Sequence, residues 1–503
     1  MIMTYLITKS NYLKHLTCPA YLWFHKKKPQ ILNIQEPTDF ALELIKSGQE
    51  VEAWARKIFT GGVLVESREA QATADTKKLI DEGKKAIFQA TFETDGLYVM
   101  VDMFEWDENN QYWIINEAKG STCDKAGESK NKKQHLYDAA FQYIVVKRAG
   151  YKVGKVNLLE LNKEYAKKGE INPAQLITKT DITEKAHELE EEINEDIEKM
   201  RILMAQDNEP PPCDCIYKSR SNHCPAFDYL YPDMPEYSVH DIALIGNSPK
   251  RLEGLVEGGY LSIYDVPEDF ELSKNQRIHV DVTQTGITTN KSAEIKNLLA
   301  EMEYPFYYLD YETYPTAVPI YDGCRPYMQI PFQYSLHIQR EPNGEYEHIE
   351  FLAEDGSTNP MKPLAESLKK VIGSKGSIIV WNKKFEKKCN ENIGEVFPEY
   401  AEEMAKINER LFDLMDIFQK NLYVHKDFKG KYSIKKVLPV LDPELSYKEL
   451  NIQDGSMAMN SWKKLVFETA NEAEKEQIKK DMLEYCKLDT WAMVRIYEAL
   501  KRL

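Results

Sequence analysis

The sequence predicts an α/β protein with two mixed strand-and-helix domains and a small helical module between them. Two stretches, residues 92–122 and 304–382, place apolar residues at the spacing of β-strands and are accompanied by helical patterns. The stretch between them carries short helical patterns separated by glycines. For a chain of 503 residues we therefore expect domains over 1–234 and 304–503, joined by a module over 235–303.

The first domain should contain two adjacent strands within FETDGLYVMVDMFEWDENNQYWIINEAKGST, joined by an Asn-rich turn. Asp102 lies in the first strand, and Glu117 and Lys119 close the second. Because side chains alternate along a strand, Glu117 and Lys119 share a face, and Asp102 is expected to meet them from the neighbouring strand. This grouping resembles the core of restriction-type nucleases, in which the acids hold Mg²⁺ or Mn²⁺ and the lysine helps to position or polarise the attacking water.

Helical patterns lie on both sides of this core. SGQEVEAWARKIF carries Glu52, and HLYDAAFQYIVVKRAG carries Gln142. Together with the core they resemble the RecB-like branch of the PD-(D/E)xK nucleases, particularly its CRISPR-associated members. That resemblance implies a catalytic core of Asp102, Glu117 and Lys119 with Glu52 and Gln142 as accessory residues. The alternative is that Glu52 and Gln142 are ordinary solvated positions on their helices, without a role in catalysis. The chain departs from the family pattern in having Val146 in place of a tyrosine and Glu52 where many relatives have histidine.

Four of the eight cysteines suggest a metal centre. Cys213, Cys215 and Cys224 lie within PPPCDCIYKSRSNHC, and Cys18 lies far upstream. A disulfide is disfavoured in a reducing compartment, and spacing alone does not separate zinc from iron–sulfur ligation. The resemblance implies that these four bind a [4Fe–4S] cluster, with zinc as the alternative. We interpret the other cysteines as small buried apolar residues: Cys123, Cys324, Cys389 and Cys486.

Two further segments complete the path to the second domain. The charge-rich stretch 182–206 has helical spacing and is expected to be an exposed helix that leads back to the cysteines. In the module, Gly258-Gly259 and the turn at 265–267 separate short helices, which we interpret as a plain connection.

The second domain should begin with an antiparallel meander. The apolar strand YPFYYLDYETYP is followed by QYSLHIQ and EHIEFLAE, and Asn343-Gly344 between the last two is a strong hairpin signal. PLAESLKKVIG then has apolar residues on one helical face, and SIIVWN follows as the next strand. The segment 445–462 has no evident chemical role.

Acidic residues recur at the ends of these elements. Asp310 and Glu312 lie two positions apart on a strand and therefore share a face, where a divalent cation would make their like charges favourable. Glu386 follows a later strand and opens a helix. Tyr485 and Asp489 lie one helical turn apart near the C-terminus.

This series resembles the DEDD superfamily of 3'-5' exonucleases, which have an RNase H-like fold, in the subtype with a tyrosine before the last aspartate. The expected order of three strands, a helix and a strand agrees with that fold. The resemblance implies that Asp310, Glu312, Glu386 and Asp489 hold two Mg²⁺ or Mn²⁺ ions and that Tyr485 orients the attacking hydroxide. Glu386 stands where the family usually has aspartate. Asp413 and Asp416, which lie between these acids, could help the metal site, but we expect them to have capping or surface roles.

Charge and hydropathy limit the possible partners. A net charge of −16 argues against a protein that coats nucleic acid by bulk attraction. Lysine clusters beside the acidic motifs could be solvated faces or could bind phosphates. These are Lys26 to Lys28; Lys130, Lys132 and Lys133; Lys383, Lys384, Lys387 and Lys388; and Lys429, Lys431, Lys435 and Lys436. No apolar run has membrane-spanning length and the N-terminus lacks a signal-peptide core, so we expect a soluble, cytoplasmic protein without a membrane partner.

The two domains together resemble a bacterial and phage-encoded family that is known largely as a domain of unknown function. The predicted activity is metal-dependent hydrolysis of nucleic acid, with DNA favoured over RNA and single-stranded ends as the substrate. Two alternatives remain open at this point. The protein could be an RNA 3'-5' exonuclease whose first domain only binds nucleic acid, or a non-catalytic nucleic-acid-binding scaffold.

Overall fold

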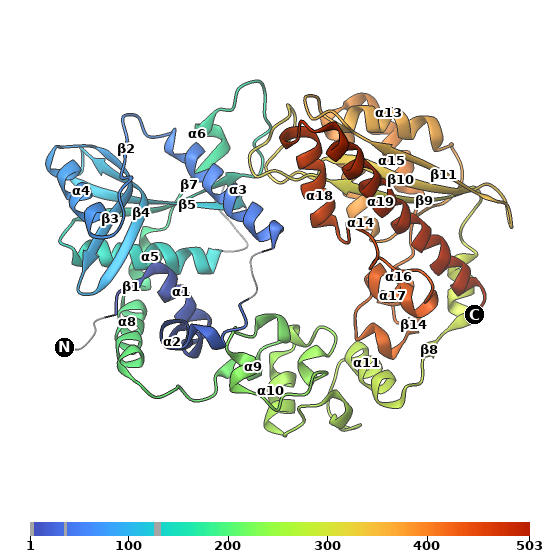
Figure 1. Ribbon diagram of the computed structural model, residues 1–503, viewed down its shortest axis with the longest axis horizontal. Coiled ribbons are helices and arrows are strands. Elements are labelled where there is room, and N and C mark those ends of the chain that lie inside the picture. The colour runs from blue at the N-terminus through green and yellow to red at the C-terminus, as the bar shows by residue number, and fades with distance from the viewer. Residues whose placement is uncertain (1–4, 35–37, 125–131) are drawn as a thin grey trace.

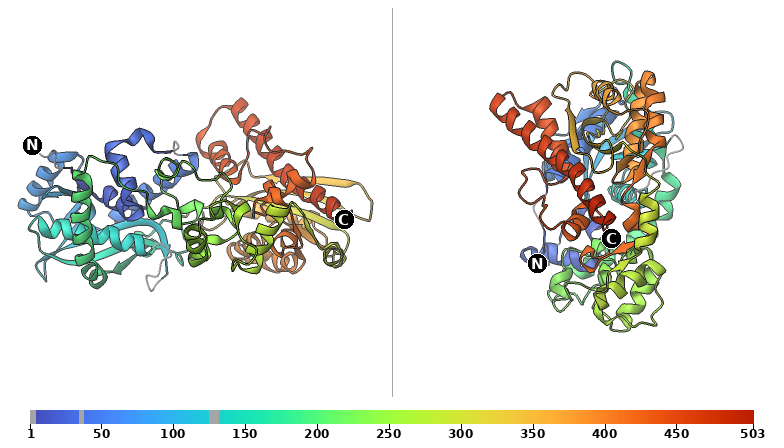
Figure 2. Two further views of the ribbon diagram at one scale, coloured as in Figure 1. Left: turned by 90° about the horizontal axis from the view of Figure 1, so that it is seen from below. Right: turned by 90° about the vertical axis from the view of Figure 1, so that its right-hand side faces the viewer.

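The computed structural model describes residues 5–34, 38–124 and 132–503 and confirms the α/β prediction. Two large sheets, each packed against helices, lie in the N-terminal and C-terminal halves of the chain, and a helical module lies between them along the sequence (Figure 1). The two halves lie side by side when the molecule is turned and viewed from below (Figure 2). No helix in the described ranges combines the length and the apolar composition needed to cross a membrane.

The N-terminal sheet contains the two strands that the alternating pattern predicted, β4 and β5, as an antiparallel pair. β3 pairs antiparallel with β4, and β6 pairs parallel with β5. The order is β2-β3-β4-β5-β6-β7, with β1 pairing beside β4. The strands are β1 (Ile7–Thr8), β2 (Val63–Leu64), β3 (Ala86–Thr94), β4 (Leu97–Asp107), β5 (Tyr112–Cys123), β6 (Val153–Asn162) and β7 (Ile177–Asp181).

Helices of this half pack against the sheet and against each other. α5 buries Ala140, Phe141 and Ile144 in the same apolar core as the sheet. The helices are α1 (Lys9–Thr17), α2 (Pro19–Lys27), α3 (Asp39–Arg56), α4 (Glu69–Asp81), α5 (Lys132–Arg148), α6 (Pro173–Leu176), α7 (Thr183–Glu188) and α8 (Glu190–Ala205).

The prediction of an exposed helix over 182–206 is wrong in part. The segment is helical as α7 and α8, and it does lead back towards the cysteines. However, Ile193, Ile197, Met200 and Met204 of α8 are buried in the core that α5 also enters. These residues recur every three or four positions, so they form one apolar face that the high charge of the segment concealed.

The module has its own small core. Leu252 and Leu255 of α10 pack with Ile263 and with Val280 of α11. The next helix, α12, instead contributes Ile295 to the core of the C-terminal half. The elements are α10 (Pro249–Glu257), α11 (Lys274–Thr285), β8 (Thr289–Asn290) and α12 (Ser292–Leu299), and β8 pairs with β14 (Tyr423–Val424). Just before the module, Phe227 of α9 (Phe227–Leu230) packs in one apolar cluster with Cys213, Cys215 and Cys224.

The C-terminal sheet has the order β11-β10-β9-β12-β13. The predicted meander is confirmed, because β9, β10 and β11 are antiparallel neighbours and Asn343 in the turn has a positive φ of 60°. β12 is parallel to both β9 and β13. The strands are β9 (Phe306–Thr313), β10 (Pro331–Gln339), β11 (Tyr346–Leu352), β12 (Ile378–Val380) and β13 (Leu411–Asp413).

Helices cover both faces of this sheet. Tyr307, Leu309 and Tyr311 of β9 share one core with α13, α14 and α15. Phe306 and Tyr308, which point to the opposite face, share another core with α19. The helices are α13 (Met361–Val371), α14 (Lys383–Val396), α15 (Ala401–Glu409), α16 (Asp416–Gln419), α17 (Ile434–Leu441), α18 (Gly455–Lys463) and α19 (Glu472–Lys501).

The two halves touch through the segment that follows β9. Ala317 and Val318 are buried in a core of the N-terminal half. The hydroxyl of Tyr327 donates a 2.5 Å hydrogen bond to the carbonyl of Gly120, directly after Lys119. Apolar burial and a hydrogen bond therefore join the two halves beside β5.

Candidate functional site

The strand β9 and the helix α19 bring the predicted C-terminal acids together. Asp310 and Glu312 project from the face of β9 that α19 covers, and Asp489 projects from α19 itself; Glu312 and Asp489 are buried. Oδ2 of Asp310 lies 4.0 Å from Sγ of Cys486, and one ligand atom each from Asp310, Glu312 and Cys486 lie within 4.8 Å of one another. We call Asp310, Glu312, Glu386, Asp489 and Tyr485 the C-terminal site.

Burial dominates the electrostatics of this site. Burial raises the pKa of Asp310 well above its ordinary value, and the charge of Asp489 raises it further. Burial also raises the pKa of Glu312, as does the charge of Asp310. For Asp489 the pKa rises to about 6 because of burial, although hydrogen bonds lower it. These carboxyl groups therefore favour their protonated forms until a cation compensates their charge.

Glu386 opens α14 and is buried near the same acids. Burial is the main cause that raises its pKa, and the charge of Asp310 adds to it. Its Oε2 atom is buried and has no hydrogen-bond partner among the described residues. A buried carboxylate oxygen without a partner is costly, so this atom fits a role as a cation ligand.

Two residues of this site were missed from the sequence. Tyr447 donates a 2.7 Å hydrogen bond from its hydroxyl to Oδ1 of Asp489. Lys435 donates a 3.2 Å hydrogen bond from Nζ to the hydroxyl of Tyr485. Tyr447 comes from the segment 445–462, to which no chemical role was assigned. Lys435 belongs to a predicted lysine cluster, but nothing in that run distinguished it from its neighbours.

Asp413 and Asp416 have the predicted capping and surface roles. Asp413 accepts hydrogen bonds from the backbone N–H groups of Asn382 and Lys383, at 3.1 and 2.9 Å, where α14 begins. Asp416 forms an ion pair with Lys420 one helical turn away. The charge of Asp413 also raises the pKa of Glu386, although burial has the larger effect.

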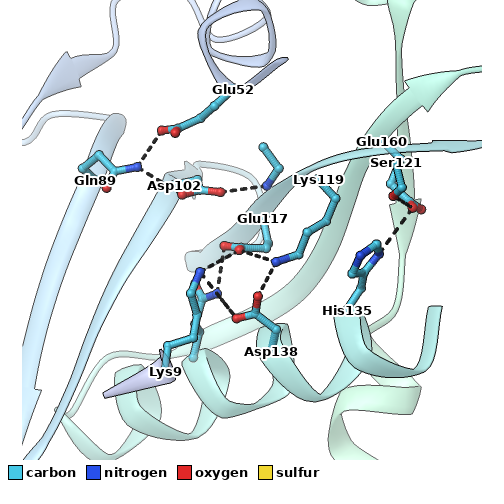
Figure 3. Close-up of polar contacts among 12 residues, drawn as sticks. Lys9, Glu52, Gln89, Asp102, Glu117, Lys119, Ser121, His135, Asp138 and Glu160 are labelled. Carbon is cyan, nitrogen blue, oxygen red and sulfur yellow. Dashed lines mark hydrogen bonds and ion pairs between the residues drawn. The ribbon is translucent and has the colours of Figure 1, made fainter. Parts of the chain in front are cut away.

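The predicted residues of the first domain also meet, as Figure 3 shows. Nζ of Lys119 lies 2.8 Å from Oε1 of Glu117, and Nε2 of Gln142 donates a 2.8 Å hydrogen bond to Oε2 of the same carboxylate. Oδ2 of Asp102 accepts a 2.9 Å hydrogen bond from the backbone N–H of Ala118. Strand alternation thus places Asp102, Glu117 and Lys119 as expected, and α5 supplies Gln142.

Glu52 reaches this group through Gln89. Nε2 of Gln89 donates hydrogen bonds to Oε1 of Glu52 at 2.5 Å and to Oδ1 of Asp102 at 3.1 Å. Glu52 is also paired with Arg56. We call Asp102, Glu117, Lys119, Glu52 and Gln142 the N-terminal site.

Lys9 and Asp138 were missed from the sequence but lie at the centre of the N-terminal site (Figure 3). Nζ of Lys9 lies 2.8 Å from Oε1 of Glu117 and 3.5 Å from Oδ1 of Asp138. Asp138 is also paired with Lys119. Lys9 is a single lysine at the start of the chain, and Asp138 is one polar position in a helix that is buried on all sides there, so neither carried a local signal.

The charges of the N-terminal site compensate each other to a large degree. Burial alone would raise the pKa of Glu117, but the charges of Lys119 and Lys9 outweigh it and lower the pKa. Burial raises the pKa of Asp102 well above its ordinary value, and the charge of Glu117 adds to this. Glu117 is therefore ionised without a metal ion, whereas Asp102 favours a proton until a cation binds.

The four predicted metal ligands Cys18, Cys213, Cys215 and Cys224 form a buried group, the cysteine cluster. Their Sγ atoms lie within 4.8 Å of one another, and those of Cys213 and Cys224 are 3.9 Å apart. A tetrahedral ion with metal–sulfur bonds of about 2.3 Å would place the sulfurs about 3.8 Å apart. A four-iron cluster binds each thiolate at a different iron and needs a wider spacing. The donor set fits a metal centre, and the spacing is closer to that around a single ion.

Four lysines of the predicted clusters form surface ion pairs in the described ranges. Lys27 and Lys28 pair with Asp207 and Glu209, and both Lys387 and Lys388 approach Glu391. Lys130 lies outside the described residues. Among the cluster lysines that the structure describes, Lys435 is the one whose amine contacts a predicted site residue.

Comparisons with known proteins agree with part of the family expectation. A family model described as "Domain of unknown function (DUF2779)" matches residues 307–433. The chain is similar to the "Uncharacterized protein UU173" of Ureaplasma parvum serovar 3, with 29% identity over 247 residues, covering 44% of this chain and 35% of that protein. It is also similar to the "Uncharacterized protein MG366" of Mycoplasma genitalium, with 30% identity over 219 residues, covering 40% of this chain and 33% of that protein.

The chain thus covers about a third of the length of these curated relatives. No solved structure matches the chain. The matched family region contains Asp310, Glu312 and Glu386 but ends before Tyr485 and Asp489.

Proposed function

We propose that the protein is a metal-dependent nuclease with two active sites, and that its C-terminal site hydrolyses nucleic acid from the 3' end with two divalent ions. The observation that carries this proposal is the gathering of four carboxylates, of which Glu312, Glu386 and Asp489 are buried and Asp310 is partly exposed. Asp310, Glu312, Glu386 and Asp489 make no ion pair with any described residue, and Lys435 is the cation whose charge lowers the pKa of Asp310, Glu312 and Asp489. A site of this kind is unfavourable unless Mg²⁺ or Mn²⁺ binds to it.

The side chains divide the work of the proposed reaction. Asp310 and Glu312 from β9, Asp489 from α19 and Glu386 from α14 would hold the ions. Bound ions would activate the attacking water and stabilise the leaving 3'-oxygen. The Tyr485 hydroxyl would orient the water, and Lys435, which donates a hydrogen bond to that hydroxyl, would fix its direction.

The fold supports the same class. Three antiparallel strands followed by two parallel ones, in the order β11-β10-β9-β12-β13, is the arrangement expected for an RNase H-like exonuclease. In this arrangement the central strand β9 carries Asp310 and Glu312, and α19 crosses the same face with Asp489. The DEDD resemblance and the sheet order are independent observations that favour one function.

For the N-terminal half we propose a RecB-like PD-(D/E)xK nuclease. Asp102 and Glu117 would hold a divalent ion, and Lys119 would help to position or polarise the attacking water. The support is that five residues chosen from the sequence converge in one place with two further charged residues, Lys9 and Asp138. Charged side chains are seldom buried, so the burial of several of them in one place favours a functional site over an ordinary surface.

For the cysteine cluster we propose a structural metal centre. The [4Fe–4S] cluster is the centre that the family resemblance implies, and a single zinc ion is the one that the sulfur spacing favours. Either would join the start of the chain to the end of the first domain, which lies almost two hundred residues away.

The test compares single-stranded DNA and RNA of one sequence, each labelled at the 5' end, in the presence of Mg²⁺. We expect DNA to shorten stepwise from its 3' end, and to do so also in Lys119→Met protein. Stepwise shortening of RNA alone would favour the RNA exonuclease alternative. Intact DNA and RNA with both Mg²⁺ and Mn²⁺ would contradict the nuclease proposal and favour a binding scaffold.

A further inference from the structure

We infer that Lys9 is a functional residue of the N-terminal site, and that its ammonium group occupies the place of a second metal ion so that this site works with one. The inference rests on the proposed nuclease function and deepens it. It assigns the two active sites different metal requirements: one ion in the N-terminal site and two in the C-terminal site.

The position of Lys9 supports this role. Its Nζ atom lies 2.8 Å from Oε1 of Glu117 and 3.5 Å from Oδ1 of Asp138, so it bridges two buried carboxylates. Lys119 bridges the same two carboxylates from the other side. Figure 3 shows the two amines and the two acids alternating around one small space. In two-metal sites a divalent ion bridges such a pair of acids.

The balance of charges points the same way. In the N-terminal site four acids, Asp102, Glu117, Asp138 and Glu52, face three cations, Lys9, Lys119 and Arg56. One negative charge remains, and one divalent ion exceeds it. In the C-terminal site four acids face one nearby lysine, which leaves three negative charges when all four are ionised, a number that two divalent ions would offset.

Asp102 is where the single ion would bind. Within the described ranges Asp102 forms no ion pair, and its oxygens accept hydrogen bonds from Gln89 and from the backbone of Ala118. Glu117 is the neighbouring acid whose charge acts most strongly on Asp102. Glu117 and Asp138 both pair with Lys9 and Lys119, so Asp102 is the acid of the predicted pair that has no amine partner among the described residues and remains for the metal.

The fold holds Lys9 in this position from both sides. Lys9 begins α1, and Tyr12 of the same helix is fully buried and stacks on Phe141 of α5 at 4.9 Å between ring centroids. Cys18, a member of the cysteine cluster, is the C-cap residue of α1. The cluster thus fixes the far end of the helix that delivers Lys9, which gives the proposed metal centre a role in the N-terminal site.

The test uses full-length protein with Asp310→Asn and Asp489→Asn to silence the C-terminal site, and measures Mn²⁺ binding by calorimetry and DNA cleavage separately. Replacing Lys9 by methionine removes a positive charge beside the metal, so we expect Mn²⁺ to bind roughly fivefold more tightly or better. We expect cleavage to fall at least about tenfold, because the positive charge would no longer stabilise the reacting phosphate. Lys9→Arg should restore part of the cleavage.

Lys14→Met is the matched control, because Lys14 lies on the same helix and its amine contacts Ser10 instead of the site. It should change neither Mn²⁺ affinity nor cleavage. If Lys9→Met lowers Mn²⁺ affinity and cleavage together, Lys9 has a merely structural role and the inference is overturned. Binding of two Mn²⁺ ions at the N-terminal site of protein that retains Lys9 would also overturn it. The Mn²⁺-binding measurement tests the inference even if no DNA is cleaved. Failure of the proposed function is therefore distinguishable from failure of the inference.

Discussion

The hydroxyl of Tyr447 donates a 2.7 Å hydrogen bond to Oδ1 of Asp489, and this contact joins a loop of the C-terminal half to the last acid of the candidate exonuclease site. The hydrogen bond favours the ionised form of Asp489 and lowers its pKa, although burial still holds that pKa at about 6. In the proposed reaction Tyr447 would therefore position Asp489 as a metal ligand.

Replacing Tyr447 by phenylalanine should lower the rate of 3' degradation by roughly tenfold to a hundredfold, the usual cost of losing an outer hydrogen bond to a metal ligand. Without the donor the pKa of Asp489 rises, so the acid limb of the pH–rate profile should move to higher pH. The measurement is the profile of both proteins at saturating Mg²⁺. An unmoved limb would contradict the role assigned to Tyr447.

The stability of the protein should respond to Mg²⁺ and pH together. Burial raises the folded-state pKa of Asp310, Glu312 and Asp489, so the stability that these groups contribute is present at low pH and is lost as pH rises through the folded pKa, about 6 for Asp489. In the proposed function Mg²⁺ would bind the ionised forms of these acids. It should therefore raise the unfolding temperature more at pH 8 than at pH 5, as measured by calorimetry.

Asp310→Asn provides the control for that prediction, because it removes one buried negative charge. It should raise the unfolding temperature of the metal-free protein at pH 8 and reduce the response to Mg²⁺. An equal Mg²⁺ response at both pH values would show that the buried acids are not the binding groups.

Several site residues followed from local sequence patterns, and others did not. Asp310 and Glu312 share a face because strand side chains alternate, and Tyr485 and Asp489 share a face because they are four residues apart on a helix. Such spacings are visible in sequence. Lys9 and Tyr447 are brought to their sites by tertiary packing. No pattern within a single segment indicates which distant residue will contact the site in the folded protein.

Gln89 illustrates a second reason why a residue of the N-terminal site could not be predicted from the sequence. It lies within β3 but has a positive φ of 55°, an uncommon conformation for a residue other than glycine. This local change of backbone direction accompanies the two hydrogen bonds from Gln89 to Glu52 and Asp102. Neighbouring residues in the sequence do not indicate it, because the conformation depends on the partners that the side chain meets.

Loss of one thiolate should release the metal of the cysteine cluster. Cys224→Ser protein should contain little bound metal and should unfold at a lower temperature than the parent, because the metal joins distant parts of the chain. Cys324→Ser is a matched control, since Cys324 is also buried but lies outside the cluster. Metal analysis and thermal unfolding of the two variants measure the difference; equal metal content would contradict the assignment.

The visible spectrum of the parent protein identifies the metal. A brown protein with a broad absorption at about 400 nm that disappears in Cys224→Ser would show an iron–sulfur cluster. A colourless protein with one zinc ion per chain would agree with the short sulfur spacing.

The central claim is that the buried acids around β9 and α19 form a two-metal exonuclease site. The most direct measurement is the degradation of 5'-labelled single-stranded DNA by protein that carries Lys119→Met, with and without Asp310→Asn, and with Asp416→Asn as a surface-acid control. We predict that Asp310→Asn lowers 3' degradation by a factor on the order of a thousand while the control retains it. Undiminished stepwise degradation by the folded Asp310→Asn protein would contradict the account.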